Sequence, residues 1–200
     1  MARFARKDMN PSAEYALSLL YTLWMPGVYM VKGLKDTSGL ITIGFSGTET
    51  APNTFVQSQI DLQLNVLDRE VFVVYGLNLD LTPPDVVPGL NTATFASIST
   101  TSRTAVGNLS NSNVLGTAGD QIRSSGGPGD GIGFTFSSAD SPPTQLEYLG
   151  IIATNNFFLQ IVGANNVGTK AVSGRMYGVR AVADASIYSA LVQSELLSAN

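Results

Sequence analysis

This sequence predicts an all-β fold, an antiparallel β-sandwich of about eight strands, on three observations. Apolar and polar residues alternate over 60–66, which is the period of a half-buried strand. Similar short runs follow through the chain, and most are separated by the turn-forming residues Gly, Pro, Asn, Asp or Ser. A length of 200 residues suits one undivided all-β domain.

The candidate strands follow one another from residue 27 onward. The run 71–81 begins apolar on both faces and becomes one-sided near Gly76, as expected for a central strand that runs out toward an edge. Two Pro- or Gly-rich stretches, 82–91 and 124–131, predict long loops. The other candidate strands are 27–33, 39–46, 92–100, 131–138, 147–154, 157–163 and 170–182.

The uncharged stretch Tyr15–Val31 admits three interpretations. A transmembrane helix is disfavoured because Pro26 and Gly27 interrupt the stretch. A signal peptide is disfavoured because Asp8 and Glu14 lie between the basic start and the apolar part. We prefer a short helix over 11–25 followed by a strand. The residues at helical spacing are Ala13, Ala16, Leu17, Leu20, Leu23 and Trp24.

The C-terminal segment returns to helical spacing over 184–198. Asp184 can cap this helix, and Ile187, Leu191 and Leu196 share one face. The predicted organisation is a basic N-terminal arm and helix over 1–26, a β-sandwich domain over 27–182, and a C-terminal helix over 183–200.

The amino-acid composition excludes several classes of catalytic and metal-binding site. The chain has no histidine and no cysteine, which removes imidazole and thiolate chemistry and the common metal ligands. Only 13% of the residues are charged, the net charge is −4, and 44% are hydrophobic. Soluble domains average about 25% charged residues, so we expect partners to cover much of this surface. The composition favours a structural, self-assembling protein over an enzyme and predicts no cofactor.

Few acidic residues form a candidate site. Asp68 and Glu70 would share one strand face, and they are the one pair we could nominate for catalysis, although such pairs are ordinary on solvated faces. The turn Asp36–Gly39 is expected to join strands 27–33 and 39–46 as a hairpin. Calcium candidates in or near loops are Asp120, Asp130 and Asp140, but they lack the dense alternating acids of an EF-hand loop.

Taken together, the features resemble the single jelly-roll coat proteins of icosahedral viruses. These features are a basic arm with Arg3, Arg6 and Lys7, a short helix, and about eight strands with Pro/Gly-rich loops. The resemblance covers the architecture of the whole chain, and no sequence motif carries it. It implies a jelly roll and a self-assembling capsid subunit, located in the virion and made in the host cytoplasm. The arm is less basic than in many coats that package RNA directly, which would suit a coat resting on an internal membrane or other lining.

This interpretation names the expected partners and contacts. The partners are copies of the chain, other capsid proteins, and a genome or internal membrane in weak contact with the arm; no small-molecule substrate is expected. The helices 11–25 and 184–198 would clamp subunits together, and the loops 82–91 and 124–131 would lie at the outer surface or at symmetry axes. The residues expected in assembly or internal-surface contacts are Arg3, Arg6, Lys7, Leu17, Leu20, Trp24, Leu191 and Leu196.

A second class of function stays open. The same composition fits a β-sandwich binding module, such as an adhesin, a fibre head or a carbohydrate-binding domain, which could be trimeric. Exposed aromatic residues on one face would favour it, and the candidates are Tyr75, Phe95, Tyr148 and Tyr177.

Overall fold

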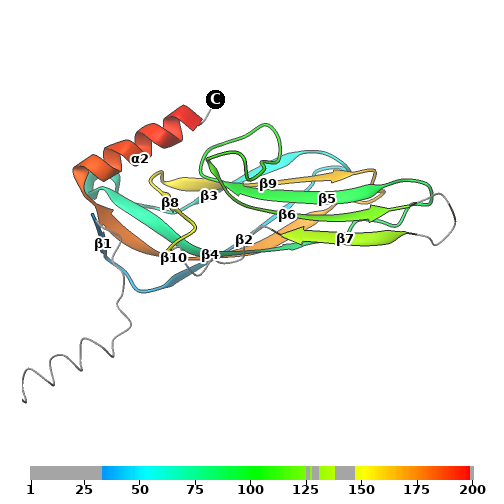
Figure 1. Cartoon of the computed structure of the whole chain (residues 1–200), viewed down its shortest axis with the longest axis horizontal. Coiled ribbons are helices and arrows are strands. Elements are labelled where there is room, and N and C mark those ends of the chain that lie inside the picture. The colour runs from blue at the N-terminus through cyan, green and yellow to red at the C-terminus, as the bar shows by residue number, and fades with distance from the viewer. Residues whose placement is uncertain (1–32, 125–126, 128–130, 138–146, 199–200) are drawn as a thin grey trace, which may run out of the picture. The chain divides into compact units, whose positions relative to one another are not determined.

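The computed structural model describes residues 33–124, 127, 131–137 and 147–198. These residues form two antiparallel sheets and one C-terminal helix (Figure 1). Sheet A contains β1 (Leu34–Asp36), β2 (Ile41–Thr48), β4 (Glu70–Leu81), β8 (Gly150–Ile152) and β10 (Ala171–Ala183). Sheet B contains β3 (Val56–Asp61), β5 (Thr92–Ser99), β6 (Val114–Arg123), β7 (Ile132–Ser137) and β9 (Asn156–Ala164).

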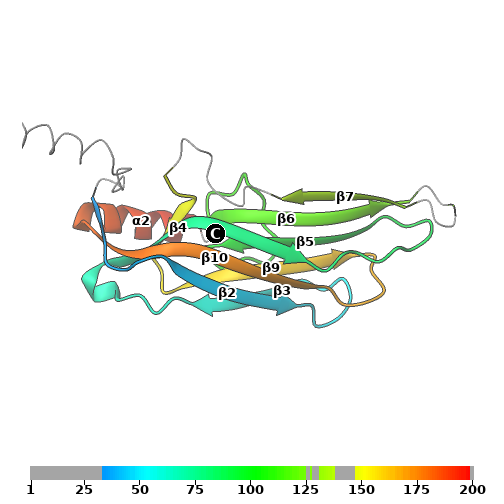
Figure 2. The same cartoon turned by 90° about the horizontal axis from the view of Figure 1, so that it is seen from below.

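The strand order is that of a jelly roll. In sheet A, β10 lies between β2 and β4, and β8 follows β4; in sheet B the order is β3-β9-β5-β6-β7. From β2 to β5 the chain changes sheet at every step, and it does so again from β8 to β10. This connectivity wraps the chain as two Greek keys. The predicted antiparallel sandwich, whose two layers are seen in Figure 2, is therefore confirmed. β1 and β7 are added to the eight strands of the roll.

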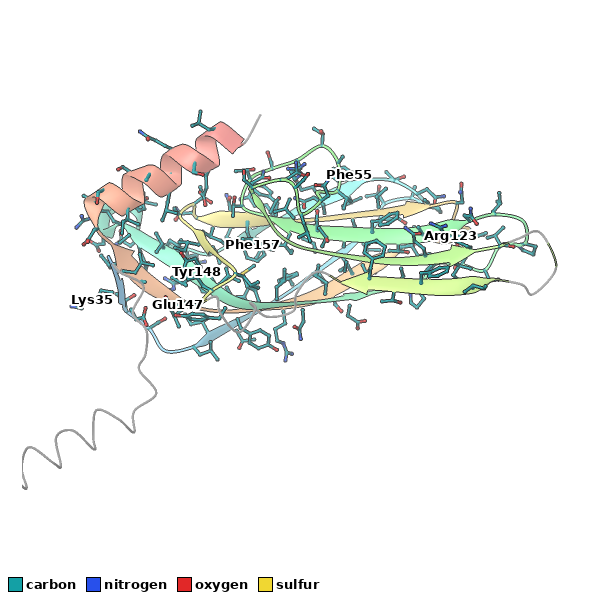
Figure 3. All side chains as sticks on the ribbon, viewed as in Figure 1. Lys35, Phe55, Arg123, Glu147, Tyr148 and Phe157 are labelled. Atoms are coloured by element: carbon teal, nitrogen blue, oxygen red, sulfur yellow. The ribbon has the colours of Figure 1, made fainter. Side chains whose placement is uncertain are left out.

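The main core lies between the two sheets. Phe157 of β9 is fully buried there (labelled in Figure 3). Its ring meets that of Phe45 edge-on, with 5.5 Å between the ring centroids. Tyr75 is an extra residue in β4 opposite β10, a β-bulge that changes which alternate positions face inward. Phe72 and Val74 point into the core before the bulge, and Leu77, Leu79 and Leu81 after it.

A second apolar cluster lies on the opposite face of sheet A. Val71 and Val73 alternate with the core residues of β4 and so point away from the sandwich. The helix α2 (Ala185–Ser198) packs there through Ile187, Tyr188, Leu191 and Val192, which confirms the predicted C-terminal helix. Gly33 lies beneath the helix at φ 86°, and a β-carbon at this position would lie 2.2 Å from the Ile187 side chain.

One strand prediction was wrong in part, and one strand was not predicted. The strand expected over 60–66 ends at Asp61, because the carbonyl oxygens of Leu62 and Gln63 accept hydrogen bonds from the Arg180 guanidinium instead of a neighbouring strand. The alternation there still reports burial, since Leu62 and Leu64 lie in the core. Sequence reasoning missed β6 altogether, because its glycines break the apolar pattern.

The expected hairpin at Asp36–Gly39 is also wrong. β1 and β2 do not pair with each other: both pair with the same edge of β10, one after the other. Residues 37–40 are a break in one long edge strand, and the Ser38 hydroxyl fills the gap by accepting a hydrogen bond from the Arg180 amide. The candidate strand 27–33 lies almost wholly outside the described residues.

The remaining strands agree with the prediction to within a few residues. The expected runs 39–46, 71–81, 92–100, 131–138, 157–163 and 170–182 correspond to β2, β4, β5, β7, β9 and β10. The run 147–154 is shorter than expected, since only Gly150–Ile152 pairs as β8.

Candidate assembly surfaces

Several loops gather at one end of the sandwich. They are the β2–β3, β4–β5 and β9–β10 connections, with the described part of the β6–β7 connection beside them (right in Figure 1). The two long loops predicted from the sequence are thus neighbours: the Gly89 amide donates to the Ser124 hydroxyl at 3.1 Å.

Buried Glu49 joins three strands at this end. The residue is only 4% exposed. One carboxylate oxygen accepts a hydrogen bond from the Gly163 amide at 2.6 Å, and the other accepts one from the Lys170 amide at 2.8 Å. A single side chain therefore holds the end of β2 against the end of β9 and the start of β10.

A second contact ties the 82–91 loop to the same place. The Lys170 ammonium lies 2.6 Å from an Asp85 carboxylate oxygen and also donates to the Pro83 carbonyl. The other Asp85 oxygen accepts hydrogen bonds from the Val167 and Gly168 amides, both at 2.9 Å. These bonds, led by the one from Gly168, hold the pKa of Asp85 below its ordinary value. The contact is therefore intact at neutral pH and is lost as the pH falls through that lowered pKa.

Asn166 completes this arrangement, which we call the loop clamp (Glu49, Asn53, Asp85, Asn166 and Lys170). The Asn53 side chain makes two hydrogen bonds to the Asn166 backbone: its amide nitrogen donates to the Asn166 carbonyl at 2.9 Å, and its amide oxygen accepts from the Asn166 amide at 2.7 Å. The Asn166 side chain also accepts from the Asp85 amide and donates to the Ala93 carbonyl. Three loops are thereby held together by polar side chains that have partners, and all of these except the exposed Asn53 are buried or half-buried.

The loop clamp presents apolar side chains at its surface. Val86, Leu90 and Val167 are 65%, 48% and 76% exposed, respectively, and they lie on the two loops that Asp85 joins. We call these three residues the tip cluster. No sequence pattern marked the loop clamp, because its members are single polar residues from five separate positions.

A second apolar surface lies on β7. Ile132, Phe134 and Phe136 occupy alternate positions on one face of this strand and are 64%, 50% and 44% exposed. The Phe136 ring lies over Gly119 of β6 and 5.9 Å from the Phe95 ring of β5. The Arg123 guanidinium, at the end of β6, lies 5.8 Å from the Phe134 ring centroid (Arg123 is labelled in Figure 3). We call Ile132, Phe134 and Phe136 the β7 strip.

A buried polar network fixes the long loop over 100–113. Gln160 of β9 is fully buried, accepts from the Ser97 hydroxyl at 2.7 Å, and donates to Ser99 and Gln57. Gln57 also accepts from the Arg103 amide, and the Arg103 guanidinium donates to Asn111 and Asn113. The loop therefore covers the outer face of sheet B over β5 and β9 through these paired polar groups, although the buried Nε atom of Arg103 has no hydrogen-bond partner among the described residues.

The C-terminal helix carries one buried acid. Glu195 is 7% exposed, and one of its oxygens accepts a hydrogen bond from the Ala153 amide at 3.0 Å. Burial raises the pKa of Glu195 above its ordinary value, although hydrogen bonds from Ala153 and Thr154 act in the opposite direction. The folded chain therefore holds this proton more tightly than the unfolded chain does.

We expect Glu195→Gln to stabilise the protein at neutral pH. With the pKa raised in the folded state, the stabilisation by Glu195 is complete below its unfolded pKa and declines as the pH rises through the folded one. Glutamine keeps the acceptor for Ala153 and has no charge to bury, so the melting temperature at pH 7 should rise by roughly 2 to 4 °C. Melting curves from pH 4 to 8 check this; an equal rise at pH 4 would contradict it.

The sequence-predicted contact residues fall into two groups. Arg3, Arg6, Lys7, Leu17, Leu20 and Trp24 lie outside the described residues, as does the helix over 11–25. Leu191 packs on the chain's own sheet, and Leu196 belongs to α2 with its side chain outside the described part. Their roles in assembly stay predictions.

The acidic candidates do not come together. Asp120 lies on β6 between Thr94 and Thr135, and Asp130 and Asp140 lie outside the described residues. The described residues contain no group of three or more acidic side chains that could hold a metal ion. Asp68 and Glu70 do not share a strand face as expected, because Asp68 ends the 3-10 helix Val66–Asp68 and Glu70 begins β4.

The candidate aromatic residues do not form one exposed face either. Tyr75 and Tyr148 are half-buried against the α2 cluster, and Phe95 lies in sheet B under Phe136. Tyr177 lines a groove on sheet A.

No helix in the part of the chain described here has the length and apolar composition to cross a membrane.

The comparisons with known proteins find only distant similarity. No protein-family model matches the chain, and no curated protein matches it. A solved structure of Merkel cell polyomavirus VP1, an unassembled pentamer, is similar at 9% identity and a TM-score of 0.33, covering 76% of this chain and 98% of that one. A structure from Desmodium yellow mottle tymovirus is similar at 10% identity and a TM-score of 0.29, covering 81% of this chain and 99% of that one. VP1 of the trichodysplasia spinulosa-associated polyomavirus is similar at 7% identity and a TM-score of 0.27, covering 74% of this chain and 97% of that one.

Proposed function

We propose that this chain is a viral structural protein, a self-assembling capsid subunit that forms an icosahedral shell. One observation carries the proposal: six exposed apolar side chains gather in the tip cluster and the β7 strip, in a chain of which only 13% is charged. Clustered apolar surface marks a contact with a partner, whereas scattered exposed residues do not. Few charges also mean little repulsion between identical copies.

The loop clamp supports the same conclusion. Contacts between copies cost conformational entropy when they must order mobile loops. Here Glu49 and Lys170, at 4% and 3% exposure, already fix the loops that carry the tip cluster. A jelly roll by itself hosts many functions, so the proposal depends on these surfaces and not on the fold.

The remaining partners follow from the same proposal. Arg3, Arg6 and Lys7 would face the interior and contact genome phosphates or an internal membrane. Other capsid proteins would complete the shell, the protein would reside in the virion, and synthesis would occur in the host cytoplasm. Because the apolar face of α2 is occupied by sheet A, this helix would clamp a neighbour through its exposed side, where Leu197 is 79% exposed.

The test is to express the full chain and measure its mass by mass photometry, with negative-stain microscopy of the same sample. Closed particles of many copies are expected. A monomer or trimer that stays so at high protein concentration would contradict the proposal.

Removing residues 1–26 gives a further expected result. Assembly should be abolished because the arm and the first predicted helix are lost, whereas the sandwich should stay folded because its described core begins at Leu34. Particle counts by microscopy and far-ultraviolet circular dichroism measure the two effects separately. If the truncated chain forms normal particles, the arm is not required for assembly.

One observation favours the binding-module alternative. An open groove of about 480 Å³ lies on the outer face of sheet A, and it offers one aromatic ring beside several hydrogen-bonding groups. Its lining residues are Asn78, Leu79, Asp80, Ser173, Gly174, Arg175 and Tyr177. Glycan-array binding that is lost in Tyr177→Ala, by a chain that forms no particles, would favour this alternative over the capsid.

A further inference from the structure

β7 is an edge strand without the usual protection. It pairs with β6 on one side, and no described strand pairs with its other side. Its sequence, Ile-Gly-Phe-Thr-Phe-Ser, has no charge and no proline, and its register with β6 has no bulge. Monomeric proteins usually guard such an edge with charges, proline or bulges, because free backbone groups there recruit another strand.

The strip on this edge is held in a fixed arrangement before any partner arrives. Phe136 rests on Gly119, where a side chain would collide with its ring, and Phe95 supports it from β5. Arg123 lies against Phe134. These contacts limit the rotamers of both rings, so a partner strand would meet a surface that costs little entropy to order.

We propose that β7 pairs antiparallel with β7 of a second copy, about a two-fold axis that passes beside Phe134. Such an axis, perpendicular to the sheet, places the outer faces of sheet B from the two copies on the same side. It also pairs even-numbered residues with even-numbered residues and odd-numbered with odd-numbered. In the register centred on Phe134, Ile132 faces the partner's Phe136, and Phe134 faces the partner's Phe134. Each exposed apolar side chain of the strip thus meets an apolar counterpart, which is the favourable type of cross-strand pair.

The size of this contact fits a shell better than a free dimer. An aromatic side chain buries about 150–250 Å² when fully covered, so three half-exposed side chains offer about 300 Å² per copy. Stable dimers bury about 1,200–2,000 Å² in total. The pairing is therefore too small for a stable dimer of free copies at ordinary protein concentration, and it is sized as one of several contacts of a subunit. In this respect it rests on the proposed capsid function.

The experiment uses single cysteines, because the native chain has none. Directly opposed residues in an antiparallel pair have α-carbons about 4.5–5.5 Å apart, which lies within the range that a disulfide spans. Phe134→Cys should therefore give a covalent dimer when assembled particles are oxidised and run on a denaturing gel without reductant. Thr135→Cys is the matched control: it faces the partner's Gly133, so its own counterpart lies beyond reach.

The outcomes are separable from those of the proposed function. Particles in which Phe134→Cys forms dimers, and Thr135→Cys does not, support the pairing. Particles without a Phe134→Cys dimer, or with equal dimer from both variants, overturn it while the capsid function stands. If the wild-type chain forms no particles, oxidation at millimolar concentration still tests the pairing: a dimer specific to Phe134→Cys supports it, and its absence overturns it. A different protein on the edge would also give no covalent dimer of this chain.

A charge variant provides an independent measurement. Phe134→Lys should reduce particle yield at least tenfold and leave the circular dichroism spectrum unchanged, because the side chain is half exposed in the single copy. Ser46→Lys places the same charge at an exposed position of β2, an edge strand of sheet A, and should leave the yield unchanged. Equal yields from the two variants would overturn the pairing.

Discussion

Glu49→Ala is expected to lower the free energy of unfolding by about 3 kcal/mol, because two buried amides lose their acceptor. These are the amides of Gly163 and Lys170, each of which donates to one oxygen of the Glu49 carboxylate. The loss would release the end of β2 from β9 and β10 and loosen the loops that carry the tip cluster. Urea denaturation followed by circular dichroism measures the change.

The control for this variant is Glu147→Ala. Glu147 is exposed just before β8, so its removal should change the free energy of unfolding by less than about 0.5 kcal/mol. Equal effects of the two variants would show that Glu49 is not the residue that holds this end of the sandwich. Faster hydrogen exchange at Gly163 and Lys170 in Glu49→Ala would show the effect to be local.

Phe157→Ala is expected to lower the free energy of unfolding by about 4 kcal/mol, more than Glu49→Ala does, because it leaves a cavity at the centre of the main core. Phe157 is fully buried between the sheets, and the alanine variant loses both its apolar contacts and the edge-on contact with Phe45. Thermal and urea unfolding measure the loss, and the folded fraction at 37 °C should fall visibly.

Leu109→Ala provides the comparison. Leu109 is 64% exposed in the loop over 100–113, and truncating it should change stability little. The stability of Phe157→Leu should lie between those of Phe157→Ala and Leu109→Ala, because leucine fills part of the space that the phenylalanine ring occupies. A Phe157→Ala variant as stable as Leu109→Ala would mean that the core can collapse around the missing ring.

Local pattern was sufficient to predict most strands. β2, β4, β5, β9 and β10 were expected close to their observed bounds, because each has one or two faces in the apolar core and the alternation records this directly. The helix over 185–198 was predicted for the same reason, from its 3.6-residue spacing. β6 was missed, since the space above Gly119 is filled by Phe136 from another strand and not by a side chain of its own.

The candidate assembly surfaces were harder to predict from the sequence than the strands. The strand containing Ile132, Phe134 and Phe136 was expected, but alternation cannot say whether an apolar face meets a core or solvent. The loop clamp was invisible for a different reason: Glu49, Asp85 and Asn166 are far apart in the sequence, and only strand order brings them together. The sequence also could not say what the apolar residues of α2 would pack against, since such a helix fits its own sheet and a neighbouring subunit equally well.

The sequence by itself determined the all-β class, most strand positions, the C-terminal helix, and the scarcity of charged and catalytic side chains. These properties follow from composition and from short-range periodicity, which each residue carries locally. The tertiary structure alone decided the jelly-roll order, the bulge at Tyr75, the loop clamp and the free edge of β7. These depend on which distant segments pair, and that choice is made by the packing of the whole sandwich and not by any one stretch of the chain.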